Sequence, residues 1–349
     1  MKDQNIKKFL CSKDITLSQA MKSIDENSSR ILFITEGDGK LIGCITDGDV
    51  RRFLLAGGSM TDMALKAANL SPKVAGNLDE ARILYHKKNF VAIPIISEEG
   101  TVVDVYNGDG DEVIEHDSLR IPVVINAGGR GTRLEPFTKV LPKPLIPVGD
   151  LPIIEHIIRE YQTYSCDEFH IIVNYKRDLM KAYFADNENH YNISWYDEDE
   201  PLGTGGGLSL LKGKINETFF FANCDVLLKA NYGKILDFHR ENGNAITMIC
   251  AYKNITIPYG VVEIGVDGII KDMKEKPLVS FLTNTGVYIV EPEVVDDVED
   301  GVSVGFPDII EKERKKGRKV AVYPVGENDW MDMGQLKELE KMRKRLYGE

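Results

Sequence analysis

A short apolar strand that runs directly into a glycine-rich loop constrains the fold more than any other feature of this sequence. The strand is VVINA at 123–127, and three of the four residues at 128–131 are glycine. Glycines let the backbone approach a ligand closely and leave amide N–H groups free to face an anion. Two cations follow, Arg133 and then Lys143, which has a restricting proline on either side. The segment therefore predicts a polyphosphate site at the end of a strand.

Two common phosphate-binding motifs are excluded at this loop. The chain has no GxxxxGK[ST] sequence, which a P-loop nucleotidase requires. The dinucleotide fingerprint GxGxxG also fails, because Leu134 stands where its third glycine should be. A tight turn would explain the glycines taken alone, but it would not explain the cations that follow them.

Downstream of this loop, apolar strand patterns alternate with helical patterns. The strand patterns are at 121–127, 169–175, 219–225 and 245–252, and the clearest helical patterns are at 152–164 and 234–242. This alternation is typical of an α/β domain built on a largely parallel sheet.

Residues 1–110 contain an internal repeat whose two copies align at a constant offset. Leu17 aligns with Leu78, and Gly39 aligns with Gly100. Each copy reads as a helix, an apolar strand, a glycine turn and a second strand. A unit this small cannot bury its own sheet, so we expect the two copies to pack on each other as a pseudo-symmetric α+β module.

The chain is therefore expected to contain two domains, in agreement with its length of 349 residues. The first covers 1–115, with repeats at about 1–60 and 61–115, and the second covers 120–349. The polar, acidic stretch at 108–120 is the expected linker.

Composition excludes several classes of protein. The net charge is −12 and neither domain is basic, so nucleic acid is not expected as a partner. No apolar run approaches the roughly 18 residues that cross a bilayer, and the N-terminus lacks the apolar stretch of a signal peptide. The five cysteines are scattered without a CxxC pair, which is typical of a reducing compartment. We therefore expect a cytoplasmic protein with no membrane partner.

Residues 121–349 resemble the sugar-1-phosphate nucleotidylyltransferases, which are also called sugar nucleotide pyrophosphorylases. The long segment GGRGTRL…PKPLIPVG carries most of this resemblance. Further pieces follow in the order typical of that family: PLGTGGGL at 201–208, NCD at 223–225, EKP at 275–277, NTG at 284–286 and WMDMG at 330–334. The resemblance implies a Rossmann-like, GT-A-like fold with a mixed, mainly parallel sheet.

The resemblance also implies roles for individual residues. Arg133 is expected to hold the leaving pyrophosphate, Lys143 the NTP phosphates and Lys276 the sugar phosphate. Asp225 and Asp332 are expected to bind Mg²⁺. The residues expected to contact the nucleotide are Asn126, Ala127, Gly128, Gly129, Gly131 and Thr132, together with Gly203, Thr204 and Gly205. Those expected to contact the sugar are Gly206, Glu275, Asn284 and Thr285.

The implied reaction is attack of a sugar-1-phosphate oxygen on the α-phosphorus of an NTP, with release of pyrophosphate. Because the nucleophile is already an anion, catalysis rests on positioning and charge neutralisation rather than on a general base. Mg²⁺ prefers a few carboxylate oxygens and shares its other positions with phosphates and water. Asp225 and Asp332 are far apart in the sequence, so only folding can join them. Taken singly, Asp332 could instead be a helix cap and Lys276 a solvated charge.

The N-terminal repeat resembles a tandem pair of CBS domains, a module that often binds adenine nucleotides. In the first copy, residues 43–49 are similar to that family's G-x-x-T-x-x-D site, which makes Thr46, Asp47 and Asp49 candidate ligands of AMP or ATP. The second copy has Asn107 where the first has Thr46, so it lacks the hydroxyl. A packing or dimerising scaffold without a ligand is the alternative.

A CBS pair joined to such a transferase domain resembles the glucosamine-1-phosphate guanylyltransferases of bacterial legionaminic acid synthesis. We therefore expect GTP as the nucleotide and glucosamine 1-phosphate as the acceptor. A mannose-1-phosphate guanylyltransferase, or a transferase for another NTP, is the alternative. A binding protein that senses nucleotides is the non-enzymatic alternative. All the expected charged residues are present, which favours the enzyme. Because CBS pairs commonly self-associate, we expect a homo-oligomer.

Overall fold

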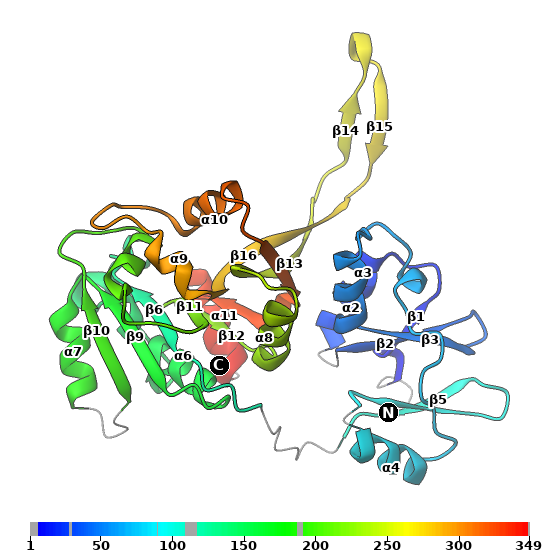
Figure 1. The fold of residues 1–349 in the computed structure, drawn as a ribbon. Helices are drawn as coiled ribbons and strands as arrows, with labels where there is room; N and C mark the ends of the chain where they lie inside the picture. Colours follow the sequence, from blue (N-terminus) through cyan, green and yellow to red (C-terminus); the bar gives the residue numbers. More distant parts are fainter. Residues whose placement is uncertain (1–5, 28–29, 89, 109–116, 187–190, 348–349) are drawn as a thin grey trace. The chain divides into compact units, whose positions relative to one another are not determined.

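The computed structural model describes residues 6–27, 30–88, 90–108, 117–186 and 191–347 and divides the chain into two compact units (Figure 1). The first unit consists of 1–114, 252–283 and 324–328, and the second of 115–251, 284–323 and 329–349. The expected linker falls largely outside the described residues, so the domain boundary there stays a prediction. The first unit takes in two segments from far along the chain, which the sequence pattern did not indicate.

A seven-stranded sheet forms the centre of the second unit. Its strand order is β10 (Asn192–Asp197), β9 (Glu168–Val173), β6 (Val123–Ala127), β11 (Phe219–Asn223), β16 (Leu278–Val290), β13 (Ile246–Thr256) and β17 (Val320–Val325). The strands from β10 to β11 are parallel, whereas β16 is antiparallel to β11. The mixed, mainly parallel α/β sheet expected from the sequence is thus confirmed.

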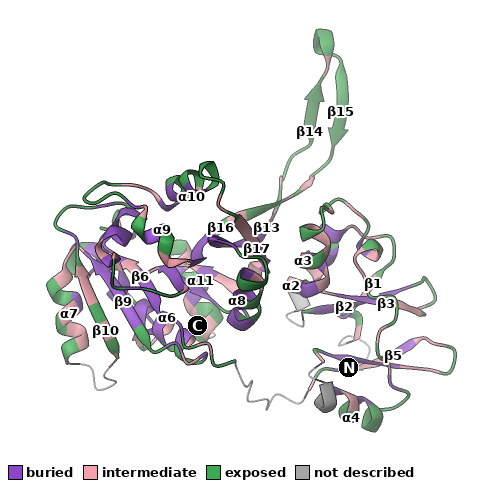
Figure 2. Ribbon diagram, in the orientation of Figure 1, coloured by how far each residue is buried: buried purple, intermediate pink, exposed green. Residues whose placement is uncertain are grey.

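Helices pack around this sheet, and Figure 2 shows that its central strands are buried. Strands buried on both faces read as continuous apolar runs, which is why they stand out in the sequence. The helices are α5 (Phe137–Val140), α6 (Ile153–Gln162), α7 (Arg177–Ala185), α8 (Tyr232–Glu241), α9 (Pro292–Asp296), α10 (Phe306–Lys315) and α11 (Leu336–Tyr347). In the described part of the chain, none of the helices is long and apolar enough to cross a membrane.

Aromatic packing holds α6 and α8 against the sheet. Tyr161 of α6 lies 5.3 Å from the ring of Phe220 in β11 and 4.8 Å from the ring of Tyr232 in α8. All three side chains are buried. Such ring pairs add to the free energy gained from burying apolar area, so this cluster fixes the helices in place on one face of the sheet.

In the first unit the two copies of the repeat fold alike. The first contains β1 (Leu10–Ser12), α2 (Leu17–Asn27), β2 (Ile31–Thr35), β3 (Leu41–Thr46) and α3 (Asp47–Leu55), and the second contains α4 (Leu78–Lys88), β4 (Ile93–Ile96) and β5 (Val102–Tyr106). The β2–β3 pair has a bulge after Ile34, and the β4–β5 pair has one at the equivalent position, after Ile95.

The hairpin turns of the two copies bond to each other reciprocally. Gly39 and Gly100 have φ angles of 83° and 84°, a backbone conformation that glycine adopts without strain. The N–H of Leu41 donates to the carbonyl of Gly100 (3.0 Å), and the N–H of Val102 donates to the carbonyl of Gly39 (3.2 Å). The copies therefore pack on each other as an approximately twofold-symmetric pair.

The later segments of the first unit pack against the first copy of the repeat. Tyr252 is buried in the apolar cluster that contains Leu17 and Met21 of α2. The hydroxyl of Ser18 donates to the side-chain oxygen of Asn254 (3.3 Å). These contacts join the N-terminal repeat to the carboxyl end of β13.

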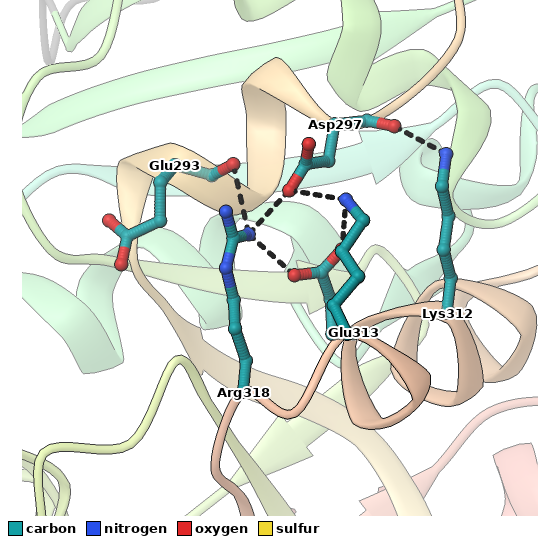
Figure 3. Close-up of polar contacts among 6 residues, drawn as sticks. Glu293, Asp297, Lys312, Glu313 and Arg318 are labelled. Atoms are coloured by element: carbon teal, nitrogen blue, oxygen red, sulfur yellow. Dashed lines mark hydrogen bonds and ion pairs between the residues drawn. The ribbon is translucent and has the colours of Figure 1, made fainter.

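A charged cluster fixes the end of α10 in the second unit (Figure 3). Glu313 is fully buried, and its carboxylate accepts from Arg318 Nη1 (2.5 Å) and Lys316 Nζ (3.3 Å). The same two cations bind the carboxylate of Asp297 after α9, Arg318 at 2.5 Å and Lys316 at 2.6 Å. A buried carboxylate is tolerated only where cations and hydrogen bonds compensate it, so this cluster depends on Arg318.

We expect Arg318→Ala to lower the free energy of unfolding by about 2–4 kcal/mol, because it removes one of the two cations that compensate Glu313. Arg314→Ala is the matched control, since Arg314 forms an exposed pair with Glu311 on the same helix. It should change stability by less than about 1 kcal/mol. Urea unfolding at pH 7 measures both, and equal losses would contradict a special role for the buried pair.

Candidate functional site

The glycine loop and Asp225 emerge from neighbouring parallel strands at the same edge of the sheet. Asn126 of β6 lies opposite Asn223, the last residue of β11. The glycine loop follows β6, and Asp225 follows β11 after a single intervening residue. The carboxyl ends of parallel strands are where open α/β sheets place their ligand sites, so the topology brings the loop and the carboxylate together.

The structure also brings Asp332 to Asp225. The short strands β12 (Val226–Leu228) and β18 (Trp330–Asp332) pair in antiparallel fashion, with Val226 opposite Asp332. The N–H of Met333 donates to the carbonyl of Asp225 (2.9 Å). Both aspartates line one pocket of about 270 Å³, whose other lining residues include Asn223 and Thr204. Two carboxylates from distant parts of the sequence therefore face one cavity.

Lys143 lies in an ion pair with Asp225, and both side chains are 16% exposed. Burial opposes the charged form of Lys143, but the negative charges around it, chiefly that of Asp225, raise its pKa. Burial and the charge of Asp225 raise the pKa of Asp332. The ammonium of Lys143 thus pairs with Asp225 and also attracts the charge of Asp332, in a partly dry site.

This donor set fits a divalent cation. Mg²⁺ is typically held by one or two carboxylates, with phosphate oxygens and water in its other positions. Within the described residues no group of three or more His, Cys, Asp and Glu side chains could hold a metal. The pair of Asp225 and Asp332 therefore suits an ion that a bound phosphate helps to hold, rather than a permanent structural metal.

Gly131 allows the glycine loop to press against the stem of Lys143. Its φ is 65°, and an added Cβ would lie 2.9 Å from Thr138 Cγ2 and 3.0 Å from Lys143 Cβ. The hydroxyl of Thr138 donates to the carbonyl of Gly131 (3.0 Å). Arg133 lies shortly after, exposed, in a 3-10 turn at Thr132–Leu134. The loop and Lys143 are thus neighbours in space as well as in sequence.

Asn126 ties the end of β6 to the second glycine stretch. Its side-chain amide donates to the carbonyls of Gly203 (3.4 Å) and Thr204 (3.2 Å). The hydroxyl of Thr204 accepts from the N–H of Phe306 at the start of α10. The side chain of Asn126 therefore holds the backbone at 203–204 in place next to the glycine loop.

Gly205 and Gly206 are needed for the packing of the chain. From the sequence they were expected only as ligand contacts. Both N–H groups donate to the carbonyl of Val304, at 3.0 and 3.2 Å. A Cβ on Gly206 would lie 2.4 Å from the carbonyl oxygen of Val302. Their amides are therefore already engaged, and the glycines are needed because another backbone segment passes so close.

Glu198 lies beside the glycine loop, which sequence reasoning missed. It follows β10 within an acidic run that reads as solvated, yet it is only 3% exposed. An added Cβ on Gly128 would lie 2.6 Å from its Oε2, and one on Gly207 would lie 2.7 Å from its Oε1. The carboxylate therefore lies between the two glycine stretches.

The charge of Glu198 is incompletely compensated. Its carboxylate accepts from the backbone of Leu202, but Oε1 is buried and has no hydrogen-bond partner within the described residues. Burial raises the pKa of Glu198 to about 7. A buried acceptor without a donor is costly, so the carboxyl group of Glu198 is held at an energetic cost to the fold.

The turn at 284–286 is held by its own side chains. The amide of Asn284 donates to the hydroxyl of Tyr288 (2.6 Å), and its oxygen accepts from the N–H of Gly286 (2.9 Å). The hydroxyl of Thr285 is buried and donates to the carbonyl of Ile249 (2.7 Å). Asn284 and Thr285 line the same pocket as Asp225, but the hydroxyl of Thr285 holds the turn.

Glu275 and Lys276 are exposed and belong to the first unit, whereas the pocket belongs to the second. Their expected contacts with the sugar and its phosphate stay predictions.

The candidate CBS residues form a helix cap. The N–H of Asp49 donates to the hydroxyl oxygen of Thr46 (3.2 Å), and the N–H of Thr46 donates to the carboxylate of Asp49 (2.9 Å). Asp49 also pairs with Arg52, and Asp47 lies 4.0 Å from Arg51. A reciprocal cap of this kind explains the spacing of Thr46 and Asp49 without a ligand, so adenine nucleotide binding stays a prediction.

Comparisons with known proteins agree with this geometry. The family model described as Nucleotidyl transferase matches residues 122–347, and the one described as CBS domain matches residues 6–56. The mannose-1-phosphate guanyltransferase of Saccharomyces cerevisiae is 34% identical over 229 residues, which cover 62% of this chain and 62% of that protein. The probable mannose-1-phosphate guanylyltransferase 2 of Oryza sativa subsp. japonica is 31% identical over 239 residues, covering 64% of this chain and 66% of that protein. The chain thus spans less than two thirds of the length of these relatives.

Solved structures share the fold. The crystal structure of HddC from Yersinia pseudotuberculosis matches with a TM-score of 0.52 at 21% identity, covering 65% of this chain and 99% of that one. The same protein complexed with GMP-PN matches with a TM-score of 0.51 at 20% identity, again covering 65% of this chain and 99% of that one. Since the matched family model runs from the strand before the glycine loop to beyond Asp332, the chain belongs to the nucleotidyl transferase family and carries a CBS domain ahead of that region.

Proposed function

We propose that this chain transfers GMP from GTP to a sugar 1-phosphate, in the presence of Mg²⁺, and releases pyrophosphate. The observation that carries the proposal is that Asp225 and Asp332 line one pocket, while Lys143, against which the glycine loop packs, forms an ion pair with Asp225. Hard carboxylates and an ammonium next to glycine-rich loop backbone suit a polyphosphate and its cation.

The residues of the chain would act by positioning the reactants and neutralising their charge. An oxygen of the sugar phosphate attacks the α-phosphorus, the bond from that phosphorus to the bridging oxygen of the pyrophosphate breaks, and pyrophosphate departs with the bonding electrons. No proton has to be removed, since the attacking oxygen is already an anion. Lys143 holds the NTP phosphates from a partly dry position, where a charge acts more strongly than in water. Arg133 would hold the leaving pyrophosphate, as the resemblance implies.

Asp225 and Asp332 would hold Mg²⁺. When bound, the ion supplies positive charge to the phosphate oxygens, which lowers the repulsion between the two anionic reactants.

The choice of GTP is supported by Glu198. The Watson–Crick edge of guanine presents two adjacent donors, N1–H and the N2 amino group, which match the two oxygens of a carboxylate. Uracil and thymine offer a single donor between two carbonyls, and the edges of adenine and cytosine pair a donor with an acceptor. The carboxylate of Glu198, set between Gly128 and Gly207, favours guanine among these bases. The relatives named as guanylyltransferases and the HddC complex with GMP-PN support the same nucleotide.

For the acceptor we propose glucosamine 1-phosphate, as in legionaminic acid-type pathways, on the combination of CBS and transferase domains. Mannose 1-phosphate is the second candidate, because it is in the names of the relatives at 34% and 31% identity. An adenine nucleotide at the first CBS copy would then modulate this activity.

A pyrophosphate-release screen of GTP, ATP, CTP, UTP and dTTP against hexose and hexosamine 1-phosphates tests the reaction. We expect GTP with glucosamine 1-phosphate to turn over fastest, by at least about tenfold over other nucleotides, a difference of about 1.4 kcal/mol. A preference for mannose 1-phosphate would select the second acceptor. A preference for another base would refute the assignment of guanine. If folded protein releases no pyrophosphate with any pair of substrates, the proposed transferase activity is refuted.

Asp225→Asn should lower kcat for pyrophosphate release at least about 100-fold across a Mg²⁺ titration, because it removes one of two carboxylates in the pocket. Asp300→Asn is the matched control, since Asp300 is exposed and pairs with Lys212. Circular dichroism checks that both variants are folded. Turnover of Asp225→Asn at the wild-type rate would contradict the metal assignment.

Glu198→Gln should raise the KM for GTP at least about tenfold and narrow the preference for GTP over UTP, because an amide offers one acceptor and one donor. In the wild type, the KM for GTP should rise as the pH falls below about 7, where Glu198 becomes protonated. Glu200→Gln, at an exposed position of the same acidic run, should change neither. If Glu198→Gln has the same ratio of KM values for GTP and UTP as the wild type, recognition of the base by this residue is refuted.

The same variant carries its own test of folding. Burial raises the pKa of Glu198 from its ordinary 4.5 to about 7, so ionising it costs the folded state free energy as the pH rises through that interval. Glu198→Gln should therefore raise the thermal midpoint at pH 8 and leave it unchanged at pH 4. If Glu198→Gln binds GTP more weakly although it is more stable, the loss of binding comes from lost recognition of the base and not from damage to the fold.

A further inference from the structure

The segment that follows β9 contacts the glycine loop, because the strands that precede the two segments are parallel neighbours. Val173, the last residue of β9, pairs with Ala127, the last residue of β6, so both segments leave the sheet at the same edge (Figure 1). The N–H of Tyr175 donates to the carbonyl of Gly128 (3.4 Å). The reaction proposed above gives the residues of this segment no role, although they lie beside the loop.

Two side chains of this segment bond to the last carbonyls of α5, the one-turn helix that follows the glycine loop. Lys176 Nζ donates to the carbonyls of Lys139 (2.5 Å) and Val140 (2.7 Å). The hydroxyl of Tyr175 donates to the carbonyl of Thr138 (3.0 Å). The last carbonyls of a helix have no partner within the helix and carry partial negative charge, which an ammonium stabilises. Lys176 and Tyr175 thus hold the carboxyl end of α5.

The backbone of Lys176 has a conformation that lysine rarely adopts. Its φ and ψ angles are 53° and 36°, in the left-handed region, which costs free energy for a residue with a side chain. Strain of this kind persists only where the surrounding structure compensates it. The ammonium supplies such contacts, since it bonds to α5 and lies 5.3 Å from the centre of the Tyr175 ring.

The helix α5 in turn contacts both the glycine loop and Lys143. The hydroxyl of Thr138, a buried residue of α5, donates to the carbonyl of Gly131 (3.0 Å). An added Cβ on Gly131 would lie 2.9 Å from Thr138 Cγ2 and 3.0 Å from Lys143 Cβ. Because the helix, the loop and the stem of the lysine are packed this closely, a shift of α5 would move the other two.

We propose that Lys176 is a positioning residue, which acts through α5 to hold the glycine loop and Lys143 where the triphosphate of the nucleotide binds. Tyr175 assists it by holding the carbonyl of Thr138. Lys176 acts on the protein rather than on the phosphates, because two of its three N–H donors are engaged by backbone carbonyls. The identity of the ligand rests on the function proposed above, whereas the bonds to α5 exist without any ligand.

Hydrogen exchange of the ligand-free chain, measured by mass spectrometry, tests the hold on α5 without any reaction. Lys176→Met keeps an unbranched side chain but removes the donors, so the amides of 131–145 should exchange at least about tenfold faster, while those of α8 stay unchanged. Lys176→Arg should restore slow exchange, since a guanidinium can donate to both carbonyls. Lys181→Met is the matched control, because Lys181 of α7 pairs with Asp197 instead, and it should leave 131–145 unchanged.

The kinetics of pyrophosphate release test what the hold on α5 does for the site. Lys176→Met should raise the KM for the nucleotide at least about tenfold and change the KM for the sugar 1-phosphate less than about twofold, because it displaces groups that hold the triphosphate. Lys176→Arg should recover most of the loss. Tyr175→Phe removes a single donor and should show the same pattern more weakly, so it replaces Lys176→Met if that variant does not fold.

Unchanged exchange in the variants would overturn the proposal, and so would faster exchange in an enzyme whose KM for the nucleotide is unchanged. A raised KM without faster exchange would mean that Lys176 binds the phosphates directly, which also overturns it. Equal rises in both KM values would indicate general damage and count against it. A wild type that releases no pyrophosphate refutes the transferase, whereas the exchange experiment still decides whether Lys176 holds α5.

Discussion

The pairing of β12 with β18 is the contact on which the rest of the site depends. It is a short ladder with Val226 opposite Asp332, and it is reinforced by the bond from Met333 to the carbonyl of Asp225. Without it the two carboxylates would belong to unrelated parts of a long chain. With it, one carboxylate comes from the end of a central parallel strand and the other from a strand that precedes α11. Backbone hydrogen bonds, rather than side-chain contacts, thus determine the spacing of the acidic groups.

The site holds several charged groups at a cost in desolvation free energy. The carboxylate of Asp225 pairs with the ammonium of Lys143 close to Asp332, and the carboxyl group of Glu198 is buried between the glycine stretches. Each of these groups carries a desolvation cost in the folded protein. Natural proteins keep such costs where the groups act on a ligand, since a pocket shaped only for stability would hold apolar side chains.

The amino-acid pattern predicted those parts of the fold that rest on local signals. Strands β6, β9, β11 and β13 were recognisable because burial on both faces makes them continuous apolar runs. The helix α10 was not, because it is rich in charge and only Phe306, Ile309 and Glu313 are buried. At the site, the loop, Lys143 and the two aspartates could be named because spacing and resemblance marked them. Glu198 could not, since its burial depends on Gly128 and Gly207, which only the fold brings around it.

The first unit is assembled from three separate stretches of the chain, two of which lie within the span of the transferase family match. Tyr252 lies among the apolar side chains of α2, and the side chain of Asn328 donates to the carbonyl of Asp25. Cutting the chain at its linker would therefore remove the side chains that pack on the segments 252–283 and 324–328. The N-terminal repeat and these two later segments therefore form one packed unit, and the repeat cannot be removed without exposing apolar side chains of both.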